Sequence, residues 1–533
     1  MRLIGHVSVC ACVLLSCAPQ ASGRAVGALI DESVVEYELF VKQVPAAADD
    51  NDGTNDLPLR TIQAAVERAM QLAQSGYGVK VHVFPGIYRE QIVMRQELGV
   101  FNACIIIESW DAGDAIVSGA DVLDAWQVED ELAFERRWPY TIADPQVEAY
   151  PDLMARNELL FVEDARLKQV AALAQVGKGT FFLDPAEQHV FLLPSRGGQV
   201  KAGSVEAGNP ARQTLLYAEN IQDLIIRDMT FVRAPTALDH PHEAVSFVDC
   251  NQLIVENSSV RYNSRRGLSL VGCSNVLLKF LFTDHNGWAG LKAKDCVNLL
   301  LQGSEAEMNG WRLLDAGYAD AHTIAAVDID NVQELSIQGL RVSENRSSGL
   351  RLRAIEEQAA LSKLFVAGNN GRGVELSGGN FELTFSNILR NHGTGLFVDA
   401  DLLVKGTVIF DNTGIQVDAQ RLRAQNNIVG TYTPATPIMR VADVGANGLE
   451  LDRNLYHAPA KQPFLYAGTP VVFADWQVLT GQDLTSIQGD PQFVDPAAYD
   501  YVPLPDSPWY SLPNQEPRGV TAEQTEAARA RLP

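Results

Sequence analysis

The chain has 533 residues, of which 66 are acidic and 42 are lysine or arginine, so its formal net charge at pH 7 is −24. This balance argues against a nucleic-acid partner, because binding to phosphates requires a basic surface. It does not exclude an acidic glycan, because a local basic patch can oppose the average charge of a protein. The length allows several domains, although a repeating fold needs only one.

Residues 1–17 predict a targeting segment. A positively charged start precedes an apolar stretch over 7–15 that is too short to span a membrane. Residues 14–17 (Leu-Leu-Ser-Cys) resemble a bacterial lipobox, in which Cys17 is lipidated after cleavage, and ordinary cleavage near Ala21 is the alternative. We expect export, as a lipoprotein of the outer membrane, periplasm or cell surface, or else as a secreted protein. No later stretch predicts a transmembrane helix, so the lipid would be the only membrane anchor.

The segment 49–95 predicts a helix followed by a strand. Apolar residues recur on one face of a helix over about 59–75, and Gly76 ends this helix. The alternating sequence of 79–84 then predicts a strand. Such a helix can cover the open end of a solenoid, whose first coil would otherwise expose unpaired strand edges.

A repeat with a fixed step of 23 residues runs through the middle of the chain. Cys250, Cys273 and Cys296 are each followed by a short, apolar, β-like phrase. A constant step of this size indicates one supersecondary unit per repeat, and no intervening stretch is long enough for a helix. The pattern predicts a parallel β-solenoid. We expect the three thiols to fill a buried column, with a disulfide between adjacent coils as the alternative, and their spacing is not that of a zinc site.

A second signature, Asn-x-x-x-Gly, marks one bend in each coil. It occurs with Asn263, Asn286, Asn345, Asn369 and Asn391, and in a shortened form at Asn412. Asparagine and glycine both tolerate the left-handed backbone region of a tight bend. An asparagine at the same bend of every coil can bond its side-chain amide to the next coil, roughly 4.8 Å away. An alternating strand follows each glycine, so one set of side chains faces in and the other faces out.

Five phrases of the chain are typical of one group of secreted proteins. They lie at 53–65, 84–90, 112–120, 156–162 and 490–496 and together span nearly the whole mature chain. They resemble phrases of right-handed parallel β-helix proteins of the pectate-lyase-like (pectin lyase fold) superfamily. The resemblance implies an all-β fold built as a single-stranded solenoid. It implies less about activity, because the superfamily contains lyases, hydrolases, esterases, epimerases and proteins without catalysis.

This implied fold divides the chain into five parts. After the signal peptide at 1–17, the parts are an N-terminal cap with the first coils at 26–123, an inserted β-rich segment at 124–215, the regular coils at 216–430 and an irregular C-terminal cap at 431–533. The inserted segment is rich in aromatic residues, which we interpret either as its core or as part of a subdomain flanking a groove. We expect the last part to end in a short helix over 520–532.

The repeat breaks once, after Asn309, where the step to the next asparagine is 36 residues instead of 23. The additional residues fall within 310–323. Loops carried on rigid scaffolds are common places for functional sites, so this loop is a candidate functional site. The alternative is a surface loop without a function. Its candidate side chains are Trp311, Arg312, Asp315, Tyr318, Asp320 and His322.

A basic patch is expected beside this loop. If Leu291 faces in, the strand alternation turns Lys292 and Lys294 outward, and the same rule turns Arg351 and Arg353 outward one or two coils later. Four cations close together on an acidic protein favour a sugar that carries a carboxylate, because arginine can grip a carboxylate with two parallel bonds. The alternative is a solvated face with acidic side chains nearby.

Cleavage of a uronate chain by β-elimination requires a base, a cation that stabilises the developing enolate and a donor for the leaving oxygen. Residues 286–294 resemble the segment that carries the lysine base in one calcium-dependent pectate-lyase family. In that register Lys294 takes the base position, and Gly310-Trp311 falls on a Gly-Trp of the following coil. A lysine base needs a lowered pKa, which neighbouring cations can provide.

The calcium ligands of that family are not matched in this chain. Ala289 replaces one aspartate, and Met308, Asn309 and Arg312 stand where an acidic phrase is expected. We therefore assign no metal site and no cofactor, with calcium as the open alternative. Arginine side chains would neutralise the substrate instead.

Together these patterns predict a secreted or surface-anchored monomer that acts on an acidic polysaccharide as a lyase. Lys294 is the expected base, Arg351 and Arg353 are the expected carboxylate clamp, and His322 or Tyr318 is the expected proton donor. The other side chains expected to bind the sugar are Lys292, Trp288, Trp311 and Arg312.

Two further functions stay open. A glycoside hydrolase on the same fold needs two carboxylates about 5–10 Å apart. Candidates are Asp284, Asp295, Asp315, Asp320, Asp328 and Asp330, although the paired-Asp and Gly-His-Gly phrases of polygalacturonase-like hydrolases are not found. The protein would otherwise be a non-catalytic scaffold that binds a glycan or a partner at the cell surface.

Overall fold

The computed structural model of the protein describes most of the chain between residues 27 and 513. The described ranges are 27–97, 99, 103–113, 115–128, 134–142, 153, 156–196, 200–317, 324–433, 437–441 and 448–513. Within them, strands form one sheet of 23 strands and another of 13, and three smaller sheets. Cys17 and the helix expected over 520–532 lie outside the described residues.

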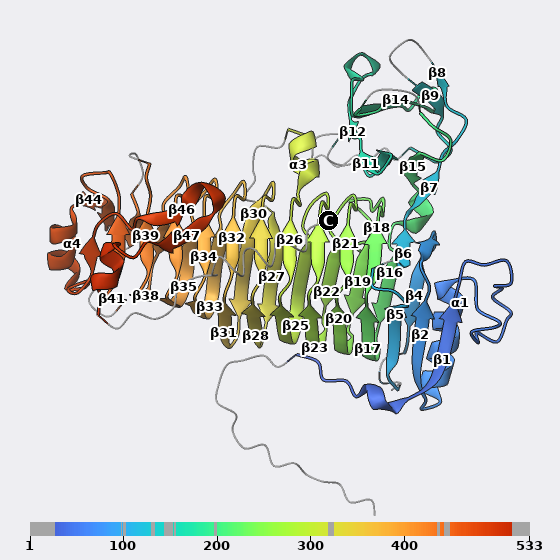
Figure 1. Cartoon of the computed structure of the whole chain (residues 1–533), viewed down its shortest axis with the longest axis horizontal. Helices are drawn as coiled ribbons and strands as arrows, with labels where there is room; N and C mark the ends of the chain where they lie inside the picture. Colours follow the sequence, from blue (N-terminus) through green and yellow to red (C-terminus); the bar gives the residue numbers. More distant parts are fainter. Residues whose placement is uncertain are drawn as a thin grey trace, which may run out of the picture.

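Each regular coil places three strands on three faces of a long prism (Figure 1). One coil contains β19 (Val245–Val248), β20 (Asn251–Glu256) and β21 (Ser259–Arg261), and the next contains β22 (Leu268–Val271), β23 (Ser274–Lys279) and β24 (Phe282–Asp284). The pairs β19–β22, β20–β23 and β21–β24 are parallel, with partners 23 residues apart. The chain is therefore a parallel β-helix, as the repeats predicted. We call the faces that hold β19, β20 and β21 the first, second and third faces.

The remaining regular strands continue these faces toward the C-terminal end. The first face adds β16 (Leu216–Glu219), β25 (Leu291–Gln302), β27 (Ala325–Val332), β30 (Ser348–Ile355), β33 (Val374–Thr384), β35 (Leu396–Lys405), β37 (Val417–Ala419), β40 (Met439–Val441) and β43 (Phe464–Tyr466), which pairs antiparallel with β44 (Thr469–Val471). The second face adds β17 (Gln222–Arg227), β28 (Leu335–Gln338), β31 (Gln358–Ser362), β38 (Leu422–Gln425) and β41 (Leu449–Asp452), together with the second halves of β25, β33 and β35. The third face adds β18 (Met229–Val232), β26 (Glu305–Glu307), β29 (Arg341–Ser343), β32 (Phe365–Ala367), β34 (Asn387–Leu389), β36 (Val408–Phe410), β39 (Ile428–Gly430), β42 (Leu455–His457) and β45 (Ile487–Gln488).

The first coils carry the predicted helix at their open end. α1 (Ile62–Gln74) begins at Thr61, whose side chain accepts a hydrogen bond from the amide of Ala64, and its apolar side packs against β1, β2, β4 and β5. The half-buried Glu90 accepts the two further amides of Ile62 and Gln63. The strands of these coils are β1 (Val35–Val41), β2 (Gly78–Val83), β3 (Gly86–Tyr88), β4 (Ile92–Arg95), β5 (Ile105–Ser109) and β6 (Ala115–Ser118).

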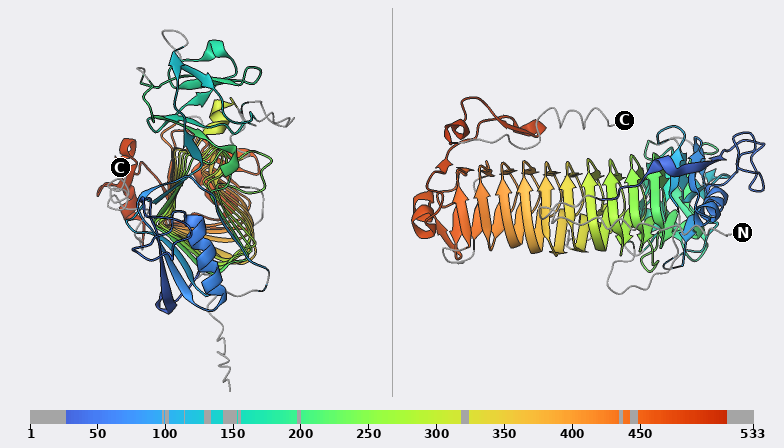
Figure 2. Two further views of the ribbon diagram at one scale, coloured as in Figure 1. Left: turned by 90° about the vertical axis from the view of Figure 1, so that its right-hand side faces the viewer. Right: turned by 90° about the horizontal axis from the view of Figure 1, so that it is seen from below.

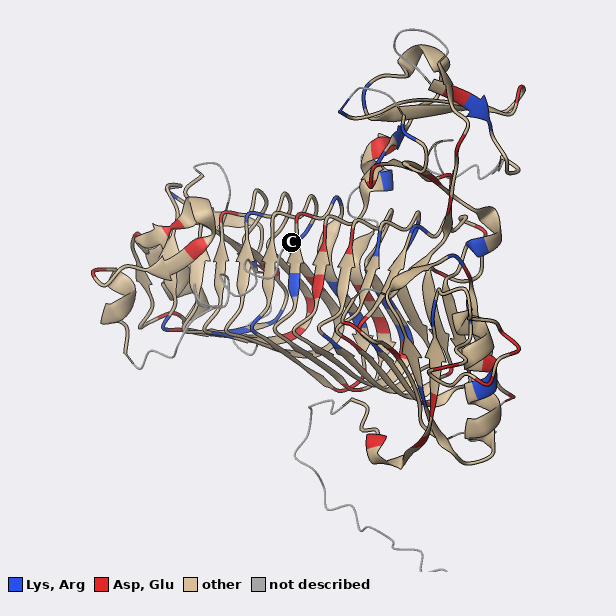
Figure 3. Ribbon diagram, turned by 45° about the vertical axis from the view of Figure 1, so that its right-hand side comes forward, with Lys and Arg blue, Asp and Glu red and all other residues tan. Residues whose placement is uncertain are grey.

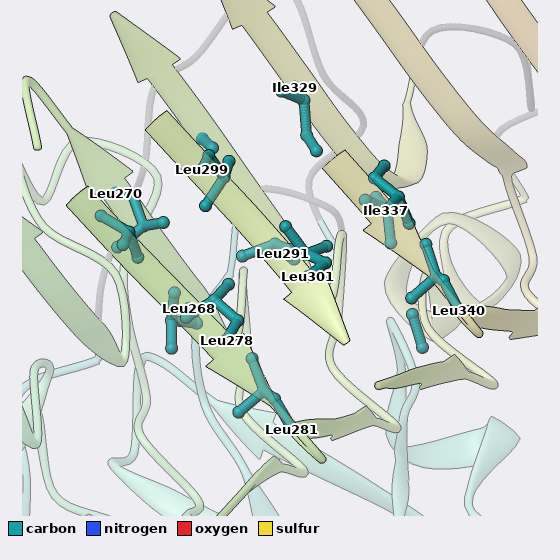
Figure 4. Close-up of a cluster of buried hydrophobic side chains, with 14 of the residues drawn as sticks. Leu268, Leu270, Leu278, Leu281, Leu291, Leu299, Leu301, Ile329, Ile337 and Leu340 are labelled. Atoms are coloured by element: carbon teal, nitrogen blue, oxygen red, sulfur yellow. The ribbon is translucent and has the colours of Figure 1, made fainter. Parts of the chain in front are cut away.

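Inward side chains of successive coils stack into one core along the whole prism. Leucine and isoleucine columns fill the interior between the faces (Figure 4). Cys250, Cys273 and Cys296 are buried and free, as the column of thiols predicted. Burial raises the pKa of the Cys296 thiol to about 12, so this group stays protonated and inert at neutral pH.

The corner between the third and first faces is held by the predicted asparagine ladder. The side-chain amide of Asn286 donates to the side-chain oxygen of Asn309 at 3.1 Å, and that of Asn309 donates to Asn345 at 3.1 Å. The ladder therefore continues across the 36-residue step, because the extra residues leave the coil and return to the same corner. Its full course is Asn263, Asn286, Asn309, Asn345, Asn369, Asn391, Asn412 and Gln416.

Residues 120–208 leave the coil between β6 and β16, at this same corner. They form a four-stranded and a five-stranded sheet that share a small core around Trp138, Leu160 and Phe181. Trp126 and Tyr140 pack against this core, which favours the core interpretation of the aromatic residues. We call this unit the insertion, and it stands above the corner of the prism (Figure 2). Its strands are β7 (Ala120–Val122), β8 (Gln127–Val128), β9 (Phe134–Arg137), β10 (Leu160–Val162), β11 (Ala165–Arg166), β12 (Lys168–Gln169), β13 (Thr180–Asp184), β14 (His189–Leu193) and β15 (Val205–Gly208).

The two ends of the described chain fold back onto the prism. Near the N-terminal end, the amide of Gly27 donates to the side chain of Asn298 at 2.9 Å, and Ala28 is buried on the second face. At the far end, α4 (Phe473–Thr480) buries Trp476 against Phe464. The chain then returns along the third face through β46 (Phe493–Asp495) and β47 (Asp500–Pro503), whose apolar side chains cover β32 to β42. None of the described helices is long and apolar enough to cross a membrane.

We predict that Asn309→Ala destabilises the protein by about 2–4 kcal/mol, since it removes the side-chain oxygen that accepts from the Asn286 amides and the side-chain amide that donates to Asn345 and Thr283. The midpoint of thermal unfolding should fall by several degrees. Asn370→Ala is the matched control, because Asn370 is the exposed neighbour of a ladder residue, and it should change the midpoint little. Equal effects of the two substitutions would contradict a stabilising ladder.

Candidate functional site

The register of the first face places the predicted cations on one outward strip. Lys292 pairs with Asp328 of the next strand, and Asp328 pairs in turn with Arg351. In the row beside it, Lys294 pairs with Asp330 and Asp330 with Arg353. Two strand spacings, roughly 9.6 Å, therefore separate the lysines from the arginines. We call the outward side chains of positions 292, 294, 328, 330, 351 and 353 the charged strip.

Carboxylates alternate with cations along this strip. Figure 3 shows acidic and basic residues side by side on neighbouring strands of the prism. The two arginines lie two coils after the two lysines, within the predicted one or two, and β27 inserts Asp328 and Asp330 between the two pairs. Both aspartates had been assigned to the hydrolase alternative from the sequence.

Arg351 is already committed to a carboxylate of the protein. Its Nε and Nη2 donate to the two oxygens of Asp328 at 3.0 and 2.8 Å, in a bidentate pair that is mostly buried. Burial alone would raise the pKa of Asp328, but the bonds and charges of Arg351, Arg353 and Lys292 hold it below its usual value of 3.8. Arg351 is therefore a positioning residue rather than an open clamp for a substrate carboxylate.

Arg353 and Lys294 are the more accessible cations of the strip. The Arg353 side chain is 39% exposed, and its Nη2 makes only long contacts, 3.5 Å to Asp328 and 3.3 Å to Asp330. The Lys294 side chain is 48% exposed and lies 3.6 Å from Asp295. Exposed pairs of this kind contribute little free energy, so both cations can turn to a ligand.

Lys292 differs from Lys294 because it is half-buried. Desolvation lowers its pKa from the usual 10.5, and the charges of Arg266 and Lys294 lower it further, while Asp328 and Glu243 oppose them. A lysine whose ammonium form is disfavoured is a candidate general base. Lys292 therefore has the electrostatic features expected of a general base. It occupies the outward position next to Lys294, the base predicted from the sequence.

Sequence reasoning missed two charged groups beside the strip. Glu243 lies 2.7 Å from Arg266 and 3.1 Å from Arg265, and Arg266 in turn lies over the ring of Trp288. The signal in the sequence was the Arg-Arg dipeptide directly before Gly267. Its second residue, Arg266, occupies the position that Ala289 occupies one coil later. Aligning the coils by their asparagines would have placed Arg266 next to the expected site.

The two tryptophans expected to bind sugar have structural roles instead. Trp288 is 6% exposed and packs with Leu238, Ala316 and Ile324. Trp311 begins the short helix α3 (Trp311–Asp315), and its indole donates to the carbonyl of His285 at 2.8 Å. The described residues after Asn309 pack on the preceding turns, because Trp311 and Arg312 bond to the carbonyls of His285 and Ser264.

Arg312 fastens the same loop and is not a substrate ligand. It is 4% exposed, and its Nε donates to the carbonyl of Ser264 at 2.9 Å. Burial lowers its pKa to about 10, which still leaves it charged at pH 7, and the carboxylates of Glu158 and Asp315 favour the charged form. Arg166 of β11 also joins the insertion to α3. It binds Asp315 at 2.8 Å and lies 3.7 Å from the ring of Trp311. Tyr318 and His322 lie outside the described residues.

The positions that were tested for calcium ligands do not gather acidic side chains. Ala289 is buried and Asn309 belongs to the ladder, whereas Met308 is exposed. Within the described ranges, no group of three or more histidine, cysteine, aspartate or glutamate side chains is placed to hold a metal ion.

A pocket of about 530 Å³ lies elsewhere, at the N-terminal end of the prism. Arg60, Tyr88, Arg89 and Glu90 contribute to its lining. Their polar atoms are largely used by the fold, because Glu90 caps α1 while Arg89 binds the carbonyl of Ala120 and the carboxylate of Glu206. This pocket is therefore a weaker candidate than the charged strip.

No family model and no curated protein sequence matches the chain. Among solved structures, the complex of XylC with xylose is similar, with a TM-score of 0.61 and 12% identity over 86% of this chain and 87% of that chain. The chain has a right-handed parallel β-helix fold. At this identity the likeness concerns the fold alone.

Two more distant structures also align with the chain. The A-module of Azotobacter vinelandii mannuronan C-5 epimerase AlgE4 has a TM-score of 0.38 and 12% identity, over 85% of this chain and 98% of that chain. Pectate lyase Pel9A has a TM-score of 0.34 and 11% identity, over 91% of both chains.

We predict that Asp328→Asn destabilises the protein and reduces the loss of stability in acid. The folded state holds the pKa of Asp328 below 3.8, so the carboxylate contributes stability above that pH, and this contribution disappears as the pH falls through the lowered value. Unfolding midpoints measured between pH 7 and pH 3 should show a shallower decline in the variant. Asp330→Asn is the control, because Asp330 is more exposed and makes only a long contact with Arg353. Its unfolding midpoint should fall with pH as steeply as that of the unmodified protein. Parallel pH curves for Asp328→Asn and the unmodified protein would refute this role of the pair.

Proposed function

We propose that the protein cleaves a uronate-containing polysaccharide by β-elimination on the charged strip. One observation carries this proposal: desolvation and the charge of Arg266 lower the pKa of the half-buried Lys292, while Lys294 on the same strand and Arg353 two strands away remain accessible. An amine whose ammonium form is disfavoured, close to two accessible cations, is suited to removing the proton beside a carboxylate.

In the proposed reaction, the amine of Lys292 takes the proton from C5 of the uronate. Arg353 and Lys294 bind the uronate carboxylate and stabilise the enolate that develops on it. The electron pair of the broken C5–H bond forms the C4–C5 double bond, and the bond from C4 to the glycosidic oxygen breaks. That oxygen takes up a proton, for which Tyr318 and His322, the donors predicted from the sequence, are the proposed sources.

The fixed ion pairs around the strip support these roles. The bidentate pair of Asp328 and Arg351 occupies the row of Lys292, so the strand next to the proposed base cannot reposition its charges freely. Arg266, held by Glu243, supplies the positive charge that lowers the pKa of Lys292 from the other side. An environment fixed before the substrate arrives stabilises a developing charge without reorganisation.

A glycoside hydrolase is the second candidate function. Asp328 and Glu375 lie on the same outward row, two strands and roughly 9.6 Å apart, which is near the separation of an inverting pair. The similar fold of XylC, which was solved with xylose, is compatible with a sugar ligand. However, Arg351 binds Asp328 and Arg372 lies 3.1 Å from Glu375, whereas hydrolysis requires one carboxyl group that is protonated.

We further propose that the protein is exported and acts as a monomer. Lipidation of Cys17 would hold it at a membrane, and cleavage near Ala21 would release it. An extracellular polysaccharide is the substrate that fits either location.

We predict that the purified protein releases unsaturated oligosaccharides from at least one soluble uronate polymer, such as polygalacturonate or alginate. The new C4–C5 double bond is followed by its ultraviolet absorbance. Lys292→Met should lower the rate by about 10²–10⁴-fold, the usual contribution of a general base. Lys279→Met is the matched control, because Lys279 is an exposed lysine of the second face paired with Glu256, and its rate should be unchanged.

The same assay separates the other functions. New reducing ends without the absorbance would indicate a hydrolase, and binding without either product would indicate a non-catalytic protein. Both outcomes would overturn the lyase proposal, as would full activity of Lys292→Met.

We predict that Arg266→Gln shifts the rising limb of the pH–rate profile to higher pH. The charge of Arg266 lowers the pKa of Lys292, so its removal raises that pKa and a more alkaline solution is needed to free the amine. The measurement is kcat/KM against pH for the variant and the unmodified protein. A shift to lower pH, or none, would show that Lys292 is not the titrating base.

A further inference from the structure

A second set of functional side chains lies on the third face, on the other side of the asparagine corner. Arg261, Asp284 and Glu307 are direct register partners on β21, β24 and β26, and they face outward. The two carboxylates are thus neighbours on adjacent strands. Arg261 lies 3.2 Å from Asp284, and Arg341 of β29 binds Glu307 from the other side.

Two rings follow directly at the corner. Tyr262 and His285 come one residue after Arg261 and Asp284, and both have left-handed backbone angles, with φ of 58° and 54°. Their rings are stacked, with centroids 4.7 Å apart and planes inclined by 25°. Phe161 of the insertion meets the ring of Tyr262 edge-on at 6.0 Å, so the insertion forms one end of this surface.

The orientation of His285 is fixed by two contacts. Its Nδ1 lies 2.8 Å from the carboxylate of Asp284, which accepts the bond and therefore places the proton on Nδ1. Its carbonyl accepts the indole of Trp311. The Nε2 edge is left as an acceptor on a ring whose side chain is 35% exposed.

The other end of the surface is formed by the returning C-terminal chain. The hydroxyl of Tyr499 donates to Glu344 at 3.2 Å, and the ring of Tyr499 packs against Phe365, over which Arg341 lies. The strands β21, β24, β26 and β29 between the two ends span three strand spacings, roughly 14 Å. This length accommodates a segment of two or three sugar residues.

Carboxylates outnumber the two arginines of this surface, in contrast to the charged strip. Arg261 and Arg341 face Asp284 and Glu307, while Glu305, the register partner of Arg341, and Glu344 add two further carboxylates, so a polyanion gains no net attraction. Carboxylates and guanidiniums held in fixed planes accept from and donate to neighbouring hydroxyl groups, and the exposed part of the stacked Tyr262–His285 pair gives apolar contact to a sugar ring. These are the requirements of an uncharged carbohydrate.

We propose that the surface formed by Tyr262, His285, Arg261, Asp284, Glu307 and Arg341 binds an uncharged saccharide chain of two or three residues. The site is independent of the proposed lyase reaction, because it lies on a different face and uses none of its side chains. It adds a recognition surface for neutral sugars to a protein whose other face suits a uronate.

The test is electrophoresis in native gels that contain a soluble neutral polysaccharide, with arabinoxylan, galactomannan and dextran as probes and polygalacturonate for comparison. We expect the unmodified protein to be retarded by at least one neutral probe. Tyr262→Asn and His285→Asn should each weaken that binding about tenfold or more, because the stacked platform is lost. Asparagine tolerates the left-handed backbone of both positions, so these variants should fold.

Two controls make the result specific. Phe385→Asn makes the same kind of change at another corner, where Phe385 has a φ of 50°, and should retain full retardation. Lys292→Met should also retain it. Asp284→Asn, which preserves shape and releases His285, gives a second variant that should weaken binding if either ring variant fails to fold.

Absence of retardation by every neutral probe would overturn the proposal. So would retardation that survives Tyr262→Asn, His285→Asn and Asp284→Asn. Retardation by polygalacturonate alone, abolished by Lys292→Met, would support the lyase site and reject the neutral-sugar site. The failure of one proposal is therefore distinguishable from the failure of the other.

Discussion

The geometry of this protein depends on the hydrogen bonds that its buried asparagine side chains must make with one another. Each ladder residue is almost fully buried and bonds to the side chain of the next coil, so a coil that moved out of register would leave donors and acceptors unpaired. The ladder sets the height and rotation of every coil at one corner. Chain segments that are longer than the repeat must leave and return there. The insertion, residues 233–244 and the loop with α3 consequently all project from this corner.

The same register decides which charges meet. Residues separated by 23 or 36 positions in the sequence become neighbours on a flat, parallel face, and their side chains point the same way. On the first face this produces a row in which Lys292, Asp328 and Arg351 alternate. On the third face it produces two adjacent carboxylates enclosed by arginines. The corner thus separates a surface with accessible cations from one in which carboxylates outnumber arginines, and a single glycan chain with both kinds of sugar would find a suitable surface on either side.

The sequence predicted the elements that repeat. The step of 23 residues, the alternation of the strands and the Asn-x-x-x-Gly bends were enough to predict the coils, the thiol column and the ladder. The helix at 62–74 followed from its apolar face. These features are local or periodic, so a single chain contains the information. Even the alternation of charges was accessible, because adding the step of 36 to position 292 gives Asp328, and only the assignment of Asp328 to a different function obscured it.

The sequence did not predict what the irregular loops do. Trp288, Trp311 and Arg312 have the composition of a sugar-binding loop, yet they pack against the preceding turns and the insertion. Whether an aromatic ring faces a ligand or a neighbouring turn depends on the path of the loop, and no period in the sequence describes that path. Lys292 and Lys294 are equally basic in sequence, and they differ only because burial and Arg266 act on the former.

The step from Asn309 to Asn345 has a consequence for how such a chain can diversify. That coil has a step of 36 residues, against steps of 23 and 24 in the coils on either side, yet the hydrogen bonds on both sides of it are unchanged in kind. Length at this corner is therefore decoupled from the stability of the scaffold. New loops can be acquired, exchanged or grafted there without disturbing the faces beside them, and related chains can keep one framework while their ligands diverge.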